Sequence, residues 1–256
     1  MSAAAIASAT MSRLVSRQVV AERTIAIQLE KPAGWRFQAG QFLDLGIIAP
    51  SETDAEGDTR SFSIASAPHE ETLMVATRLR DSAFKRELTK MPLGALVNIA
   101  GPSGDLVLDR NAHDRNAQDQ NAQRPAVFLA GGIGITPFRS MVLQAAHDKS
   151  PEPIFLFYSN RRPEDAPFLE ELQALAKLNP HYKLIASMTK MEQSHRSWHG
   201  ETGPIDKEML ARHLHNAISP VYYIAGPPAM VQALQTMIQQ SGVANSDIRA
   251  EEFAGY

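Results

Sequence analysis

The stretch Ala130-Gly131-Gly132-Ile133-Gly134-Ile135-Thr136-Pro137-Phe138 decides how the second half of the chain folds. A run of apolar residues enters it, and residues with helical spacing leave it. We expect Thr136 to cap that helix and Pro137 to fill its first position. The glycines let backbone N–H groups approach a ligand, and a helix N-terminus attracts an anion. The stretch therefore predicts either a diphosphate site or a tight strand–helix turn without a ligand.

The rest of the second half alternates between apolar runs and helical patterns. The runs that have the length of buried strands are Ala126 to Ala130, Ile154 to Tyr158, Tyr182 to Met188 and Val221 to Ala225. This alternation predicts a parallel sheet with helices on both faces. The last run leads into Ala225-Gly226-Pro227-Pro228-Ala229-Met230, a rigid turn at the edge where open α/β sheets bind ligands. The alternative is a stiff connector without a ligand.

The first third of the chain has six short runs rich in Val, Ile, Leu and Phe, separated by Gly, Pro and polar residues. They are Arg13 to Val20, Arg23 to Glu30, Gln41 to Ile48, Arg60 to Ala65, Thr72 to Leu79 and Leu96 to Ala100. Only Ser82 to Lys90 looks helical here. This pattern predicts an antiparallel six-stranded Greek-key β-barrel.

These two rhythms predict two domains. Residues 110–124 contain no large apolar side chain, so we expect a solvated loop or linker there. The expected organisation is a flexible N-terminal tail at 1–11, a β-barrel domain at 12–109, the linker at 110–124, and an α/β domain at 125–256.

The composition of the 256 residues excludes several classes of protein. The chain has no cysteine, which excludes disulfides, Cys-ligated clusters and thiolate nucleophiles within it and fits a cytoplasmic protein. Its net charge of −3 argues against nucleic acid as the main partner. No apolar stretch reaches the roughly 18 residues of a membrane span. His195 and His199 lie in a polar loop with Gly200, so we expect no metal site.

The run Arg60-Ser61-Phe62-Ser63 carries a second chemical signal. An arginine can make bidentate phosphate contacts, an aromatic ring offers a stacking surface, and a hydroxyl can donate or accept a hydrogen bond. The alternative is an ordinary strand with a surface arginine and a core phenylalanine.

The three motifs, in this order and on these two domain types, resemble the ferredoxin–NADP reductase superfamily. Its hallmarks are an Arg-x-Tyr-Ser flavin motif, a Gly-Gly-x-Gly-x-Thr-Pro-type nucleotide loop and a Cys-Gly-Pro-Pro turn. The resemblance covers nearly the whole chain. It implies an NAD(P)H-dependent reductase that passes a hydride to FAD and then electrons to a separate acceptor, such as ferredoxin, flavodoxin, an oxygenase component or a small molecule. The alternative is an electron-transfer or regulatory subunit of a larger complex. We expect a monomer.

The resemblance also implies roles for residues of the barrel. Arg60 would contact the FAD pyrophosphate, Phe62 would stack on the flavin where the family has a tyrosine, and Ser63 would lie near flavin N5. The other flavin-binding candidates are Thr77, Arg78, Ser82, Ala83, Phe84 and Lys85.

For the nicotinamide nucleotide the resemblance implies residues of the second domain. The candidates are Gly131, Gly132, Gly134, Ile135, Thr136, Pro137, Ser159, Asn160, Arg161, Arg162, Ala225, Gly226, Pro227, Pro228 and Met230. Arg161 and Arg162 favour the 2′-phosphate of NADPH, with NADH as the alternative. They could instead be surface charges neutralised by Glu164 and Asp165. With Ser63, the catalytic candidates are Glu252 and Tyr256 of the tail.

Overall fold

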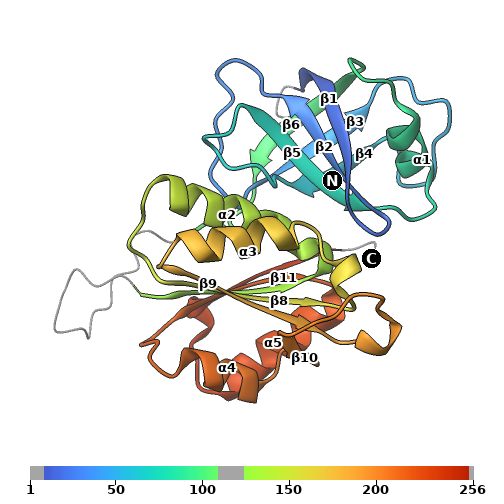
Figure 1. Cartoon of the computed structure of the whole chain (residues 1–256). Helices are drawn as coiled ribbons and strands as arrows, with labels where there is room; N and C mark the ends of the chain where they lie inside the picture. Colours follow the sequence, from blue (N-terminus) through green and yellow to red (C-terminus); the bar gives the residue numbers. More distant parts are fainter. Residues whose placement is uncertain (1–8, 109–123, 254–256) are drawn as a thin grey trace.

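The computed structural model of the chain describes residues 9–108 and 124–253 (Figure 1). The predicted linker lies almost entirely outside the described residues, and Tyr256 lies wholly outside them. The described part contains two six-stranded sheets, the first antiparallel and the second parallel. The prediction of a β-domain followed by an α/β domain is therefore confirmed.

The first domain is built from β1 to β6 and one helix. Its elements are β1 (Thr10–Ala21), β2 (Thr24–Glu30), β3 (Phe42–Ile47), β4 (Thr59–Ser63), β5 (Thr72–Arg78), α1 (Ala83–Lys90) and β6 (Leu96–Ser103). Thr10 and Met11, which we assigned to the tail, belong to the first strand. Inward side chains such as Ile27, Leu45 and Ile99 are fully buried and form the barrel core.

The strand order β4-β3-β6-β1-β2-β5 leaves β4 and β5 at the two ends of the sheet. The sheet curls so that these end strands approach each other, but they form no backbone ladder. The barrel is thus open along one seam, between β4 and β5. A seam of this kind leaves room for a ligand that a closed small barrel would exclude.

The second domain has the strand order β10-β9-β8-β7-β11-β12. Its strands are β7 (Ala126–Gly131), β8 (Ile154–Asn160), β9 (Tyr182–Met188), β10 (Glu201–Thr202), β11 (Val221–Gly226) and β12 (Ile248–Glu252). The chain moves outward from β7 to β10 and then returns to the other side of β7 with β11. The order therefore reverses between β7 and β11, and ligands of open α/β sheets bind at such a point.

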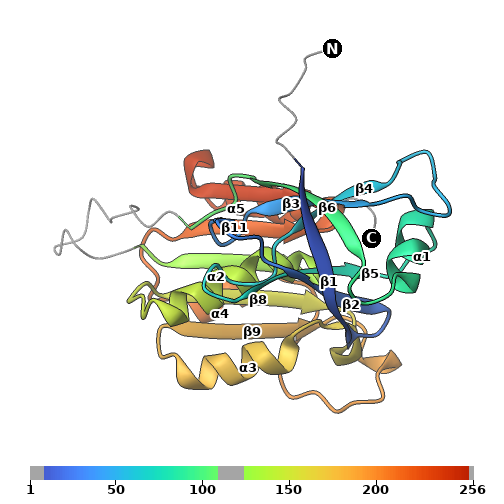
Figure 2. The same cartoon turned by 90° about the horizontal axis from the view of Figure 1, so that it is seen from above.

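Helices cover both faces of the parallel sheet, as predicted. Helices α2 (Ile135–His147) and α3 (Leu169–Leu178) lie between the sheet and the barrel, and α4 (Lys207–Leu214) and α5 (Pro228–Gln240) cover the far face (Figure 1). Figure 2, seen from above, shows the barrel lying over this domain with α1 at one end. None of the described helices is long and apolar enough to cross a membrane.

Arg139 of α2 ties the two domains together. Its side chain is only 4% exposed and donates to the Ala65 carbonyl at 2.6 Å. It also forms a two-pronged ion pair with Glu171 at 2.7 and 2.8 Å. The neighbouring Ser140 hydroxyl donates to the Ser66 carbonyl at 2.6 Å. These buried contacts fix the second domain against the barrel.

The predicted start of α2 is wrong. The chain passes through a single 3₁₀ turn, Gly132–Gly134, and continues directly into a helix that begins at Ile135. The Thr136 hydroxyl donates to the Ile133 carbonyl at 3.1 Å instead of capping the helix. Pro137 is tolerated because an N–H in the first turn has no partner within the helix.

Candidate functional site

A cavity of about 650 Å³ opens along the seam between β4 and β5. Its walls come from β4, from β5, from the segment that leads into α1, and from the second domain. The lining residues are Phe42, Glu56, Arg60, Ser61, Phe62, Ser63, Ala76, Thr77, Arg78, Arg80, Asp81, Ser82, Lys85, Ile133, Thr136, Glu251, Glu252 and Phe253. We call it the seam cavity. Its size lies in the range of cofactor sites, and its position joins the two domains.

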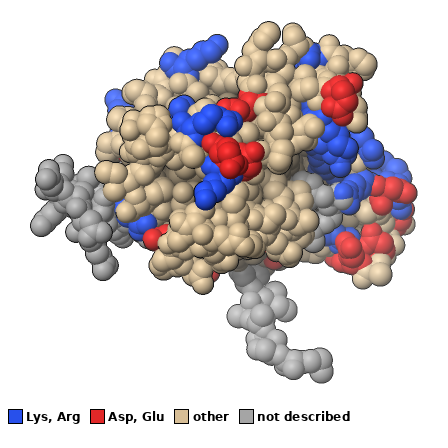
Figure 3. Space-filling view, turned by 90° about the horizontal axis from the view of Figure 1, so that it is seen from below, with Lys and Arg blue, Asp and Glu red and all other residues tan. Residues whose placement is uncertain are grey.

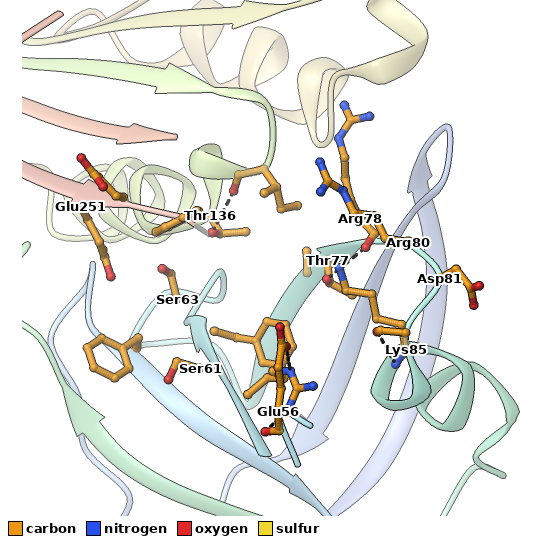
Figure 4. A pocket seen from close by; sticks show the side chains of 18 residues that line it. Glu56, Ser61, Ser63, Thr77, Arg78, Arg80, Asp81, Lys85, Thr136 and Glu251 are labelled. Carbon is orange, nitrogen blue, oxygen red and sulfur yellow. Dashed lines mark hydrogen bonds and ion pairs between the residues drawn. The ribbon is translucent and has the colours of Figure 1, made fainter. Parts of the chain in front are cut away.

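The seam cavity has two ends of different chemistry. Figure 4 shows Arg78, Arg80 and Lys85 at one end, and Ser63, Glu251 and Thr136 at the other. The first end is also the beginning of α1, where the Ser82 hydroxyl accepts a hydrogen bond from the Lys85 amide at 3.3 Å. Cations and a helix N-terminus together favour an anion such as a diphosphate.

The surroundings of Lys85 disfavour its charged ammonium form. Burial lowers its pKa, and the nearby charges of Arg80 and Arg60 lower it further. A second anion brought to this end would reverse that effect, because it would stabilise the ammonium. The positive charges at this end of the seam cavity therefore favour the binding of a negatively charged group.

Arg60 already has carboxylate partners. Its Nη2 donates to Asp54 Oδ1 at 2.9 Å, and its Nε lies 3.0 Å from Glu56 Oε2. Its guanidinium also lies over the Phe84 ring, 5.1 Å from the centroid. Sequence reasoning missed Asp54 and Glu56, because they belong to a polar loop without a motif.

The opposite end of the cavity carries a hydroxyl and a carboxyl. Ser63 is 6% exposed, and its Oγ has no hydrogen-bond partner among the described residues. Burial raises the pKa of Glu251 to about 7. A buried polar atom without a partner is costly, so Ser63 Oγ is the kind of group that a ligand satisfies.

Glu251 and Glu252 project to opposite faces of the parallel sheet. Glu251 lies opposite Ala225 in the β11–β12 pairing, on the face that packs toward α2 and the barrel. Glu252 accepts a hydrogen bond from Gln232 of α5 at 3.1 Å, on the far face. Both line the cavity, but only Glu251 is directed to the barrel side. The sequence analysis selected Glu252 as a catalytic candidate. Because successive side chains of β12 project to opposite faces of the sheet, the structure favours Glu251 instead.

The glycines of the β7 loop are required by close packing against the β11 turn. A Cβ on Gly134 would lie 2.2 Å from the Ala225 carbonyl oxygen, and one on Gly131 would lie 2.3 Å from Met230 Sδ. Gly226 has a φ of +157°, and a Cβ there would lie 3.2 Å from the Gly131 backbone. The two predicted nucleotide motifs therefore meet at the switch point of the sheet. Packing alone accounts for these glycines, so they do not by themselves identify a ligand.

The two arginines after β8 have different surroundings. Arg162 forms ion pairs with Asp165 at 2.8 Å and with Glu22 of the barrel at 2.5 Å. The hydrogen bonds that Arg162 donates to the carboxylates of Asp165 and Glu22 raise its pKa. Arg161 is exposed, and its carbonyl accepts from the Lys190 amide at 2.8 Å. These contacts favour the interpretation of Arg162 as a charge neutralised by neighbouring carboxylates. Arg161 instead faces solvent beside Lys190.

The structure gathers a large share of the predicted site residues and leaves others apart. Those that line the seam cavity are Arg60, Phe62, Ser63, Thr77, Arg78, Ser82, Lys85, Thr136 and Glu252. Phe84 is 2% exposed and lies in the barrel core, where the Arg60 guanidinium packs on its ring. Ala83 contributes a backbone amide at the start of α1. Ile135 and Pro137 are buried in the first turn of α2, and Ser159 and Asn160 end β8.

The seam cavity fits an FAD. The diphosphate would find Arg60, Arg78, Arg80 and the start of α1 at one end. The ring system would lie along β4, where Ser63 Oγ lacks a partner. Phe62 supplies an aromatic surface in the wall between them.

No group of three or more His, Asp or Glu side chains suited to a metal is found among the described residues. Figure 3 shows the molecule from below. Acidic and basic side chains are interspersed on this face, and neither sign of charge covers it.

Comparison with known proteins agrees with this architecture. Residues 128–236 match the family described as the oxidoreductase NAD-binding domain. The chain is 26% identical over 95% of its length to the reductase component 2 of terephthalate 1,2-dioxygenase from Comamonas sp., and it covers 68% of that protein. It is 29% identical over 90% of its length to the phenol hydroxylase P5 protein of Acinetobacter pittii, of which it covers 60%.

Solved structures show the same arrangement of both domains. The ferredoxin NADP⁺ reductase from Neisseria gonorrhoeae, with bound FAD and NADP, superposes with a TM-score of 0.77 at 23% identity over 95% of this chain and 98% of that one. The Amycolatopsis cytochrome P450 reductase GcoB gives a TM-score of 0.77 at 18% identity, covering 96% of this chain and 70% of that one. The chain therefore has an oxidoreductase NAD-binding domain at residues 128–236, and its two-domain fold is that of the ferredoxin–NADP reductase-like flavoprotein reductases to which it is similar.

Proposed function

We propose that this chain binds FAD in the seam cavity, oxidises NAD(P)H and passes the electrons to a separate acceptor. The observation that carries the proposal is the composition of that cavity, which joins Arg60, Phe62 and Ser63 of the barrel to Thr136 and Glu251 of the second domain. One site therefore contains an anion-binding end for a flavin diphosphate and residues of the nucleotide-binding domain. Bound FAD would supply the redox chemistry, by taking up a hydride and releasing electrons.

The chain's own residues would orient the two reactants. The buried contacts of Arg139 and Ser140 fix the distance between the domains, which meets the main need for transfer between two bound rings. The Ser63 hydroxyl would hydrogen-bond the reacting edge of the flavin. Glu251, with a pKa near 7, could hold or release a proton at physiological pH.

The nicotinamide nucleotide would bind at the carboxyl edge of the parallel sheet. The β7 loop and the β11 turn meet at its switch point, and the N-terminus of α2 lies between them and the seam cavity. Arg161, together with Lys190, offers positive charge for a 2′-phosphate. We therefore expect NADPH to be preferred, with a contribution from Arg161 rather than from Arg162.

The acceptor is proposed to be a separate redox protein. The relative from Comamonas sp. named above is the reductase component of a terephthalate 1,2-dioxygenase, which supports this choice. We further propose that the chain acts as a cytoplasmic monomer, with a barrel at 12–109 and a nucleotide-binding domain at 125–256. The absence of cysteine supports a reducing compartment.

A direct test is the absorption spectrum of the purified full chain. We expect flavin bands in a protein that carries one FAD, and loss of those bands on anaerobic addition of NADPH. A colourless protein that takes up no FAD would refute the proposal.

A further inference from the structure

The loop that joins β3 to β4, residues 50–58, carries four acidic side chains: Glu52, Asp54, Glu56 and Asp58. We call it the acidic loop. It borders the anion-binding end of the seam cavity, where Glu56 lines the wall (Figure 4). The mechanism proposed above uses none of these carboxylates.

The Asp54 carboxylate takes the place expected of a phosphate. One oxygen, Oδ1, accepts from Arg60 Nη2 at 2.9 Å. The other, Oδ2, accepts at 3.2 Å from the amide of Ala83, the first residue of α1. A carboxylate that bridges an arginine and the first amide of a helix copies the contacts a phosphate group makes in proteins.

Arg60 has no guanidinium nitrogen without an acceptor. Its Nη1 donates to the carbonyls of Glu56, Gly57 and Thr59 at 2.8 to 3.0 Å. Its Nη2 is used by Asp54, and its Nε is used by Glu56. A phosphate that binds Arg60 through two nitrogens must therefore displace at least one of these acceptors. The two carboxylates would leave first, because an incoming diphosphate repels them.

The acidic loop is held in place by other contacts on α1. Arg86 forms a two-pronged ion pair with Glu52 at 2.6 and 2.9 Å. Ser51 donates both its amide, at 2.9 Å, and its hydroxyl, at 2.6 Å, to Glu87. These anchors keep the loop on the helix, so Asp54 is presented to Arg60 as a fixed local competitor.

Asp54 is held in its charged form. Burial works against the carboxylate, but hydrogen bonds from the Glu56 amide and from Arg60 outweigh it and keep the pKa of Asp54 below its usual range. The competitor is therefore an anion over the range of pH in which the protein would work.

From these contacts we infer that Asp54, with Glu56, acts as an internal stand-in for the flavin diphosphate. The carboxylates satisfy Arg60 and the start of α1 when the cavity holds no flavin, and they must release both when FAD binds. The inference rests on the proposed function, since it concerns FAD at this site. It assigns to the acidic loop the role of weakening FAD affinity and stabilising the cofactor-free protein.

The test compares three variants of the full chain, stripped of flavin and titrated with FAD by quenching of flavin fluorescence. Asp54→Asn keeps the shape and the bond from the Glu56 amide but removes the charge. Glu56→Gln removes the second carboxylate. Asp58→Asn is the matched control, because it makes the same charge change in the same loop, and the Asp58 carboxylate accepts from the Thr59 hydroxyl and not from Arg60 or α1.

We expect Asp54→Asn to lower the Kd for FAD by about three-fold or more, the size of one partly exposed ion pair, relative to Asp58→Asn. We also expect Asp54→Asn to lower the melting temperature of the flavin-free protein but not that of the FAD-bound protein. A Kd that is unchanged or raised in Asp54→Asn, with FAD still bound by the wild type, would overturn the inference and leave the proposed function standing. Failure of the wild type and of every variant to bind FAD would instead remove both.

Discussion

Glu251 of β12 lies directly opposite Ala225 of β11, at the point where β12 reaches the seam cavity. This pairing places a carboxyl group with a raised pKa beside the turn at which the two predicted nucleotide motifs meet. The neighbouring Glu252 bonds to α5 instead. One step along a strand therefore separates the carboxyl that faces the barrel from the one that faces away.

Replacement of Glu251 by Gln should change the pH dependence of stability. Burial raises the pKa of Glu251 from 4.5 to about 7, so the folded chain keeps a proton there that the unfolded chain has lost. The contribution of Glu251 to stability is complete below about pH 4.5 and is lost as the pH rises through about 7. Urea unfolding at pH 5 and pH 8 should show a larger loss in wild type than in Glu251→Gln. Glu252→Gln should behave like wild type, and equal losses in all three proteins would contradict the assignment.

Ser63→Ala should separate folding from chemistry. Its hydroxyl is buried without a partner, so its removal should leave the stability of the flavin-free protein within about 0.5 kcal/mol or improve it. Reduction of bound FAD should slow by about ten-fold or more, because the hydrogen bond to the reacting edge is lost. Ser16→Ala, which removes a barrel hydroxyl that donates to Gln28, is the control for the reduction rate. Unchanged reduction in Ser63→Ala would remove the hydroxyl from the site.

The two arginines after β8 should respond differently to alanine. Arg161→Ala should raise the KM for NADPH by roughly ten-fold and leave that for NADH nearly unchanged, since one charge-assisted contact is lost. Arg162→Ala should mainly lower stability, because it leaves Asp165 and Glu22 without their shared partner. Steady-state kinetics with both nucleotides, beside thermal melts, measures the difference. Equal loss with NADPH and NADH in Arg161→Ala would contradict the proposed 2′-phosphate contact.

Arg139→Met should weaken the contact between the domains. The change leaves Glu171 and the Ala65 carbonyl without their buried donor, which should cost about 3 kcal/mol in the free energy of unfolding. The control is Arg196→Met, because Arg196 is half exposed and its ion pair is with the exposed Glu170. Its loss should stay below about 1 kcal/mol. Similar losses of unfolding free energy in the two variants would show that Arg139 does not stabilise the contact between the domains.

Much of the fold follows from the sequence because it depends on local patterning. Alternating apolar residues define the barrel strands, and β11 matches its predicted run to within one residue. The two-residue strand β10 is too short to carry a pattern. The helix start at Ile135 differs because a preceding 3₁₀ turn, which tertiary packing favours, extends the helix toward the glycines.

The site was harder to predict because it depends on contacts that are distant in sequence. The motif residues Arg60 and Ser63 were identified from residue type, and both line the seam cavity. The partner of Arg162, Glu22, is 140 positions away. Asp54 accepts from the Ala83 amide, 29 positions away, because the acidic loop folds back onto α1. The choice between Glu251 and Glu252 needed the register of β12, which a five-residue edge strand does not reveal by itself.

The measurement that tests the central claim most directly is anaerobic stopped-flow reduction of the purified, FAD-loaded chain by NADPH and NADH in parallel. The account predicts bleaching of the flavin absorbance with both nucleotides and faster reduction at equal concentration with NADPH. A chain that binds FAD but is reduced by neither nucleotide would contradict the proposed function. Equal rates with the two would contradict the nucleotide preference alone.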